Sequence, residues 1–551
     1  MKDMILIFPP AHDFTMPYSA MGILKAYIEN HSKMSIEVVD LNLAFYTNLI
    51  QKSNFQEYIR KSQELIAKND LSGIIQHIVS FNNKINEILS QLDKSDKYKL
   101  SKRKISAISF DTLNLTDILK ESENTDNPIM KLLIEALDFD KINKAKYIGI
   151  NISVEDQVLC ALFVAVILKN RLPEKPIVIG GNMVSRIPDR FKKLKDLKIV
   201  DYIIEGEGEL QLLNLFNGQA FSKNIFLQNI NLIKRGLYAE YSPNLYLSIF
   251  PVIPILTSRK CSWHKCDFCS IHSSWAKCRT RKIDEVITEI EYFKNLGYKY
   301  FRIIDENFQI KRMISFAKKI IDLGWNNLRF EAYSRFEKEF LDSNTANLLY
   351  RAGFRQFFWG LESIGDTTIN LVKKTSHFDK NDISKILNNV SNAGILNYVF
   401  ALVGIPNSDV NDEEKTVDYI INNSDIHSVA LGSFVVDACS PIHLNDSIRR
   451  KYNIALLDEP FRLSTEIPYL STPEWAKEET QKRAENYTRK IYNVRNDLAL
   501  SSLLNEEERF ILSDCFGSNF IQKISQNDTL KDYVDSAINN SINHKIKREL
   551  L

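Results

Sequence analysis

No stretch of the sequence is apolar over about eighteen residues, the length that a membrane-spanning helix requires. The first residues lead directly into a short apolar stretch at 4–8 and lack the pattern of a signal peptide. We therefore expect a cytoplasmic protein with no membrane partner.

An excess of charge of one sign is also lacking. The 71 basic and 69 acidic residues are interspersed and leave a net charge of +2, with no long basic run. A protein whose main ligand is nucleic acid usually carries a basic patch or stripe. We therefore expect no nucleic-acid partner.

Cysteine is scarce, because the 551 residues include only 7, too few for a disulfide framework. Three of them, Cys261, Cys266 and Cys269, lie within nine residues directly after the apolar run 251–256. The others are isolated: Cys160, Cys278, Cys439 and Cys515. This usage indicates a reducing compartment and a metal site on a loop that leaves a strand.

Three clustered thiols favour zinc or an iron-sulfur cluster. A structural zinc site of four cysteines usually has two C-x2-C pairs, and the sequence has no second pair. One alternative is a structural zinc whose fourth ligand is His264, His272 or Cys278. The other is a 4Fe-4S cluster with three thiolate ligands, which leaves the fourth iron open to a substrate or cofactor.

The length predicts more than one domain. Up to residue 225, short apolar runs alternate with helical patterns, as in the βαβ units of a parallel sheet. The expected strands lie at 4–8, 36–39, 147–152, 176–181 and 201–204, with a polar helical insertion at about 43–145. Gly180 and Gly181 end one strand, at the edge where open α/β sheets bind ligands, or they make a tight turn that needs a positive φ.

Strand and helix patterns alternate again from residue 245 to 450, and polar groups or turn residues stand at the ends of several strands. They are Asp305 and Glu306, Arg335, Glu362 and Ser363, and Gly404 with Pro406. Residues 451–551 are rich in charged residues and contain helical patterns, which predicts a C-terminal helical cap.

The cysteine motif and the strands after it resemble the radical S-adenosylmethionine (SAM) family. In that family the cluster cysteines follow the first strand of a βα barrel, and an aromatic residue, here Phe268, precedes the last of them. The usual spacing is C-x3-C-x2-C, whereas this sequence has C-x4-C-x2-C. The resemblance implies a partial six-fold βα barrel that holds a 4Fe-4S cluster on Cys261, Cys266 and Cys269, shielded by Phe268.

The resemblance also implies residues that contact SAM. Asp305 or Glu306 takes the place of the family's Gly-Gly-Glu motif, which meets the amino group of SAM, although the glycines are missing here. Capping of a helix is the alternative role for these acids. Arg335 is placed to pair with the SAM carboxylate, or it is simply an exposed arginine.

Two further strand ends match the family. The segment Gly360-Leu-Glu-Ser363 resembles the family's fourth strand, and the match implies that Glu362 and Ser363 reach the ribose or amino acid part of SAM. The segment containing Gly404 and Pro406 resembles the Gly-x-Pro strand near adenine.

The first 225 residues resemble the cobalamin-binding-type Rossmann domain that precedes many radical SAM barrels. Residues 8–10, 40–42 and 201–209 carry the resemblance together with Gly180 and Gly181, which are expected at the cofactor. The sequence lacks the Asp-x-His-x-x-Gly pattern, which supplies the histidine ligand of cobalt in base-off cobalamin proteins. Either cobalamin binds here without a protein histidine on cobalt, or the domain has lost the cofactor.

The resemblance implies an enzyme that uses the 4Fe-4S cluster to cleave SAM reductively and to generate a substrate radical. With cobalamin, the implied outcome is methyl transfer to an unactivated carbon of a small-molecule or peptide substrate, with flavodoxin or ferredoxin as electron donor. The alternatives are a cobalamin-free radical rearrangement or cyclisation of a natural product or peptide, and a non-catalytic zinc-binding interaction protein.

Overall fold

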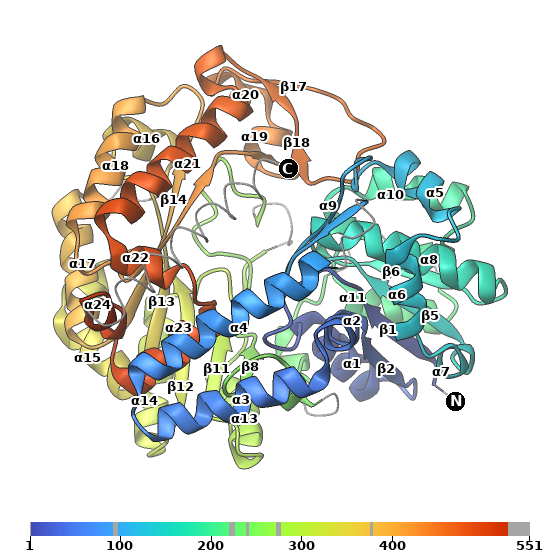
Figure 1. The fold of residues 1–551 in the computed structure, drawn as a ribbon, viewed down its shortest axis with the longest axis horizontal. Coiled ribbons are helices and arrows are strands. Elements are labelled where there is room, and N and C mark those ends of the chain that lie inside the picture. Colours follow the sequence, from blue (N-terminus) through green and yellow to red (C-terminus); the bar gives the residue numbers. More distant parts are fainter. Residues whose placement is uncertain are drawn as a thin grey trace.

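Two parallel sheets form the framework of the protein, and they lie side by side in Figure 1, joined by helices α3 and α4. The computed structural model describes residues 2–91, 97–219, 226–237, 242–271, 277–374 and 378–526. No helix in these ranges is both long enough and apolar enough to cross a membrane.

The N-terminal sheet has the strand order β2-β1-β5-β6-β7, and all its pairings are parallel. Its strands are β1 (Met4–Phe8), β2 (Ile36–Asp40), β5 (Tyr147–Asn151), β6 (Ile177–Gly180) and β7 (Tyr202–Ile203). The helices are α1 (Ser19–His31), α8 (Val158–Arg171), α9 (Asn182–Arg186), α10 (Pro188–Asp196) and α11 (Gly208–Phe216). Because β1 is buried on both faces, its sequence is a continuous apolar run.

The insertion between β2 and β5 is mostly helical, as its pattern predicts. It comprises α2 (Leu41–Ile50), α3 (Lys52–Ala67), α4 (Leu71–Gln91), α5 (Leu115–Ser122), α6 (Pro128–Ala136) and α7 (Phe139–Asn143). It also contains an antiparallel pair, β3 (Tyr98–Leu100) and β4 (Ile105–Ala107), which the helical reading missed. Buried Tyr98 and Leu100 alternate with exposed Lys99, the period of a strand and not of a helix.

The second sheet has the order β15-β14-β13-β12-β11-β8, again all parallel. Its strands are β8 (Val252–Ile255), β11 (Tyr300–Ile303), β12 (Arg329–Ser334), β13 (Phe354–Glu362), β14 (Leu396–Val403) and β15 (Ser428–Ser433). The helices are α13 (Ile283–Asn295), α14 (Ile310–Asp322), α15 (Ser343–Arg351), α16 (Asp366–Val372), α17 (Lys380–Asn392) and α18 (Val410–Asn422). Within the described residues β8 and β15 do not pair, so the expected partial six-stranded barrel is confirmed.

The C-terminal region differs from a purely helical cap. An extended segment with short strands at 455–470 lies between α20 (Asp446–Lys451) and α21 (Lys477–Val494). The other helices of this region are α19 (Pro441–Leu444), α22 (Asn496–Ser501), α23 (Glu506–Phe516) and α24 (Phe520–Ser525). The extended segment reaches the N-terminal domain near α10 in Figure 1, where Glu155 accepts hydrogen bonds from Ser464 (2.7 Å) and Thr465 Oγ1 (3.0 Å). Residues 527–551 of the expected cap lie outside the described residues.

Helix α23 closes one end of the barrel through a buried carboxylate. Asp514 accepts hydrogen bonds from Lys299 (2.8 Å), Tyr300 (3.0 Å) and Arg355 (3.2 Å), and it also pairs with Arg329. Burial opposes ionisation of Asp514, but its cationic partners outweigh burial and lower its pKa. The carboxylate is therefore charged at neutral pH and ties three barrel strands to the helix.

We predict that Asp514→Ala destabilises the barrel by about 2–3 kcal/mol, because it leaves the partly buried Arg329 and Arg355 without their counter-charge. Denaturant-induced unfolding at neutral pH measures the change. The matched control is Asp418→Ala, which removes a carboxylate from an exposed pair with Lys490 and should cost at most about 1 kcal/mol. Equal stability of the two variants would contradict the assigned role of Asp514.

Candidate active site

The carboxyl ends of both sheets border one cavity of about 310 Å³. On the N-terminal side the wall contains small residues, among them Ala20, Ser153, Gly180, Gly181, Ser185 and Gly206, together with larger apolar side chains such as Tyr18, Leu24 and Leu212. On the barrel side the wall is formed by Leu256, Arg259, Ile271, Ile304 and Glu306. The two domains therefore share one binding space next to the cysteine loop.

Two glycines of this wall, Gly181 and Gly206, have a positive φ, but they differ in the space that a side chain would have. Gly181 has a φ of +117°, and a Cβ there would lie 2.4 Å from the carbonyl oxygen of Ile152, so the turn itself requires glycine. Gly206 has a φ of +86°, and a Cβ built there would meet nothing within 4 Å. The prediction of a turn with a positive φ is confirmed for Gly181. Gly180 and Gly181 both border the cavity, and their contact with a cofactor stays a prediction.

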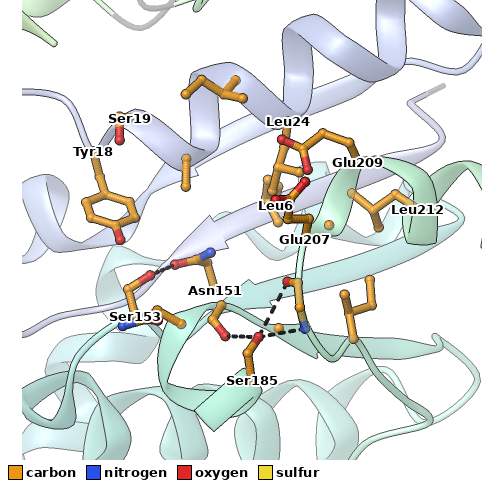
Figure 2. A pocket seen from close by; sticks show the side chains of 18 of the residues that line it. Leu6, Tyr18, Ser19, Leu24, Asn151, Ser153, Ser185, Glu207, Glu209 and Leu212 are labelled. Atoms are coloured by element: carbon orange, nitrogen blue, oxygen red, sulfur yellow. Dashed lines mark hydrogen bonds between the residues drawn. The ribbon is translucent and has the colours of Figure 1, made fainter. Parts of the chain in front are cut away.

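Hydrogen bonds fix the strand ends around the cavity, as Figure 2 shows. Ser185 Oγ donates to the carbonyl oxygen of Gly181 (2.8 Å) and accepts from the amide of Gly206 (2.9 Å). Ser153 Oγ donates to Asn151 Oδ1 (2.6 Å). The bonds of Ser185 join the loops after β6 and β7, and the bond of Ser153 fixes the chain at the end of β5.

The cysteine loop follows β9 (Ser258–Arg259), a short strand directly after β8. Cys266 is buried and Cys261 and Cys269 are half-buried, and the Cys269 amide donates to the carbonyl oxygen of Cys266 (3.2 Å). Phe268 packs against the hydrophobic core. In the described ranges no three His, Cys, Asp or Glu side chains are already arranged to hold a metal ion, and cluster ligation by the three thiols stays a prediction.

The surroundings of the thiols are cationic. Burial raises the pKa of Cys266 to about 12 and also raises that of Cys269, whereas the nearby Lys374 ammonium opposes both shifts. A metal must therefore displace protons from these thiols, and the bound cluster would carry negative charge. The cation beside the two thiols suits such a cluster.

The structure bears on the alternative fourth ligands. His264 is exposed, and its Nδ1 bonds to the carbonyl oxygen of Ser262 (2.9 Å). Cys278 is half-buried and lies close enough to Cys261 for the two thiols to interact electrostatically. His272 lies outside the described residues. Of the two alternative ligands within the described residues, Cys278 is the one near a thiol of the motif.

The two acids after β11 have different environments. Asp305 is fully buried and accepts from the backbone and hydroxyl groups of Thr257 (2.7 and 2.5 Å) and Ser258 (2.9 and 2.7 Å). Glu306 borders the cavity and accepts from the Lys260 amide (3.2 Å). Asp305 therefore anchors the chain ahead of the cysteines, and of the two acids only Glu306 faces the shared space.

Arg335 lies against the cysteine loop. Its guanidinium carbon is 3.9 Å from the ring centre of Trp263, and its Nη2 donates to the carbonyl oxygen of Lys374 (3.1 Å). Its Nε is buried and has no hydrogen-bond partner among the described residues. Arg335 is half-buried, so the alternative that it is simply an exposed arginine is wrong. Its Nε is available to an anionic ligand.

Glu362 lies at a bulge at the end of β13, with a φ of +59°. A bulge re-aims the side chain, and here the Glu362 carboxylate pairs with Lys374. Burial would lower the pKa of Lys374, but Glu362 outweighs it and raises that pKa. Gly360 makes the approach possible, because a Cβ there would lie 2.0 Å from Lys374 Nζ.

The other expected SAM contacts face the protein interior. Ser363 Oγ bonds to Thr416 Oγ1 (3.0 Å) and accepts from the Gly365 amide (3.0 Å). Gly404 has a φ of +77°, and a Cβ there would lie 2.4 Å from Thr480 of α21. Pro406 is buried beside it. These contacts give Ser363 and Gly404 packing roles, and their contacts with SAM remain predictions.

Several residues at this site gave no sequence signal. Tyr18 and Ser19 border the cavity from the start of α1, and Arg259 and Arg279 lie buried on either side of the cysteine loop. An arginine after an apolar strand is common, so the sequence alone does not indicate that Arg259 has a role at the site. Its role becomes visible from the residues with which it pairs. Those partners are distant in sequence.

We predict that Glu362→Ala weakens SAM binding by roughly one to two powers of ten, the effect of losing a charge-assisted hydrogen bond of about 1.5–3 kcal/mol. Anaerobic calorimetric titration of the cluster-loaded protein with SAM measures the affinity. Glu414→Ala, an exposed acid on α18, is the control and should bind as wild type. Unchanged affinity and unchanged 5'-deoxyadenosine production in Glu362→Ala would contradict the assignment.

The two facing sheets, the cysteine loop and the cavity between them define a class: the chain has the fold of the cobalamin-dependent radical SAM enzymes. It is similar to the radical SAM methyltransferase TsrM from Kitasatospora setae, solved with cobalamin and a [4Fe-4S] cluster, with 13% identity over 93% of this chain and 90% of that one and a TM-score of 0.55. The chain is also similar to the cobalamin-dependent S-adenosylmethionine radical enzyme OxsB, with 12% identity over 100% of this chain and 80% of that one and a TM-score of 0.56. The expected fold is confirmed.

The sequence is related to radical SAM enzymes. It is 24% identical to the anaerobic magnesium-protoporphyrin IX monomethyl ester cyclase of Rubrivivax gelatinosus, over 40% of this chain and 45% of that protein. It is 23% identical to the ribosomal protein uS12 methylthiotransferase RimO of a Hydrogenobaculum species, over 44% of this chain and 62% of that protein. These matches span less than two thirds of either relative. No protein-family model matches the chain.

Proposed function

We propose that the protein is a cobalamin-dependent radical SAM enzyme that transfers a methyl group to an unactivated carbon. The observation that carries this proposal is the cavity between the two sets of strand ends, with the cysteine loop at its barrel side. The glycine, serine and alanine residues of the wall leave room for a flat corrin, its apolar side chains suit the corrin face, and the buried Nε of Arg335, which has no hydrogen-bond partner among the described residues, suits the carboxylate of SAM.

The residues have distinct tasks in this proposal. Cys261, Cys266 and Cys269 hold a 4Fe-4S cluster, and Arg335 and Glu306 orient the carboxylate and amino groups of SAM. When bound, the cluster supplies the electron that cleaves SAM reductively, and the corrin supplies the methyl group. The two walls would limit the access of water to bound ligands, which would protect a radical from quenching.

The substrate in this proposal is a small molecule or a peptide. It reaches the region where the two domains meet, and flavodoxin or ferredoxin delivers the electron. We assign no nucleic-acid substrate, because the chain has a net charge of only +2.

The test is anaerobic reconstitution with iron and sulfide, followed by incubation with SAM, hydroxocobalamin and a strong reductant. We expect about four iron and four sulfide per chain, one retained corrin, and 5'-deoxyadenosine that forms only with the reductant. A colourless protein that holds zinc and leaves SAM intact would favour the zinc-binding alternative. Cleavage of SAM without corrin retention would favour the cobalamin-free radical reaction.

A further inference from the structure

Four buried charged residues connect the N-terminal domain to the cysteine loop. Glu207 Oε2 lies 2.8 Å from Arg259 Nη1 and 3.0 Å from Arg279 Nη1, and its Oε1 pairs with Arg279 Nη2. Glu209 also pairs with Arg259. The four side chains are between 1% and 8% exposed. Two carboxylates thus balance two guanidinium groups inside the protein.

The two arginines hold both ends of the cysteine loop. Arg259 precedes Cys261 by two residues, and Arg279 directly follows Cys278. They are register partners in the antiparallel pair of β9 with β10 (Arg279–Thr280). Like charges that face each other across strands repel, so this pair requires the carboxylate between them. The Glu207 carboxylate therefore holds Arg259 and Arg279, and with them the two ends of the loop, together.

The same carboxylates belong to the cavity. Glu207, Glu209 and Arg259 border it, as do Gly206 and Gly208 on either side of Glu207. Figure 2 shows Glu207 and Glu209 next to each other, with Leu24 and Leu212 nearby. A ligand that fills the cavity would contact the backbone that carries Glu207. Its binding would fix the carboxylate on which the loop depends.

We propose that Glu207 is a positioning residue that couples the cavity to the cysteine loop, so that a corrin in the cavity and a cluster on the loop favour each other's binding. The proposal rests on the proposed function. Coupling of this kind is reciprocal and is typically about 5- to 150-fold in affinity. It would keep the protein from assembling one cofactor site without the other.

The experiment measures hydroxocobalamin affinity by absorbance titration, with and without the reconstituted cluster. For the wild type we expect the cluster to tighten corrin binding by a factor in that range. For Glu207→Gln, which keeps the shape and removes the charge, the factor should fall close to one. Glu209→Gln, which among the described ion pairs removes the one with Arg259 and leaves those of Glu207 in place, should give an intermediate factor.

Glu289→Gln is the matched control. Glu289 forms a buried pair with Arg281, two residues beyond Arg279, but it lies on α13 of the barrel and not in the N-terminal domain. This variant loses an ion pair of the same kind and should keep the wild-type coupling.

A second readout does not depend on either cofactor. Hydrogen exchange in a peptide spanning 258–271 should become faster in Glu207→Gln than in the wild type and in Glu289→Gln. If the wild type binds corrin and Glu207→Gln keeps the full coupling, the inference is overturned while the proposed function stands. If the wild type binds no corrin, both are overturned.

Discussion

Replacing any one of Cys261, Cys266 and Cys269 with alanine is expected to abolish the visible absorbance of the reconstituted protein and its cleavage of SAM. The three thiols lie on one loop, and a cluster that keeps an iron open for SAM has no spare ligand. The measurements are iron and sulfide content, the absorbance spectrum, and 5'-deoxyadenosine after reduction.

The matched variant is Cys278→Ala, because the Cys278 thiol is near enough to Cys261 to interact with it. We expect this variant to keep a full cluster and its activity. Loss of metal in Cys278→Ala would instead indicate a closed site with four thiolates, as in a structural zinc site. Cys160→Ala, in the buried part of α8, controls for nonspecific loss of a thiol. A full cluster in a variant of the first three cysteines would disprove the assignment.

Filling part of the cavity is expected to weaken corrin binding strongly and to leave the cluster in place. Ala20 borders the cavity from the second position of α1, and Ala20→Trp places an indole there. Accommodating such a side chain costs roughly 1–3 kcal/mol, which corresponds to about 5- to 150-fold weaker binding. Corrin retained after gel filtration, measured alongside iron content, tests this.

Ala20 is a better position for this test than the glycines of the wall. A side chain at Gly181 would collide with the backbone of Ile152 and distort the turn even without a ligand. The control is Asn30→Trp, because Asn30 is exposed near the end of the same helix. It should retain corrin like the wild type. Equal retention by Ala20→Trp would mean that the corrin lies elsewhere or is not bound.

Local patterns were sufficient to predict the strands of both sheets. Buried parallel strands such as β1 and β5 are short apolar runs with turns after them, and this pattern depends only on neighbouring residues. The cysteine loop was also predictable, because its three thiols lie close together in the sequence. The hairpin at 98–107 was missed because its strands of three residues are too short for a period to stand out.

Chemical types alone did not decide which polar residues face the site. Asp305 and Glu306 are adjacent acids, yet one anchors Thr257 and the other borders the cavity. Ser363 matches a family segment, but its hydroxyl bonds to Thr416, fifty-three positions away. Such partners are set by helix packing, which a local pattern does not contain.

The sequence by itself determined the strands of the two sheets, the clustering of three thiols within residues 261–269, and the place of glycine at the end of β6. Only the tertiary structure decided that the two domains share a cavity, and that Glu207 joins Arg259 and Arg279 across it. The physical reason is that strand formation and thiol clustering depend on neighbours in the chain. A buried ion pair depends instead on groups that folding brings together from distant segments, and its stability exists only once water is excluded.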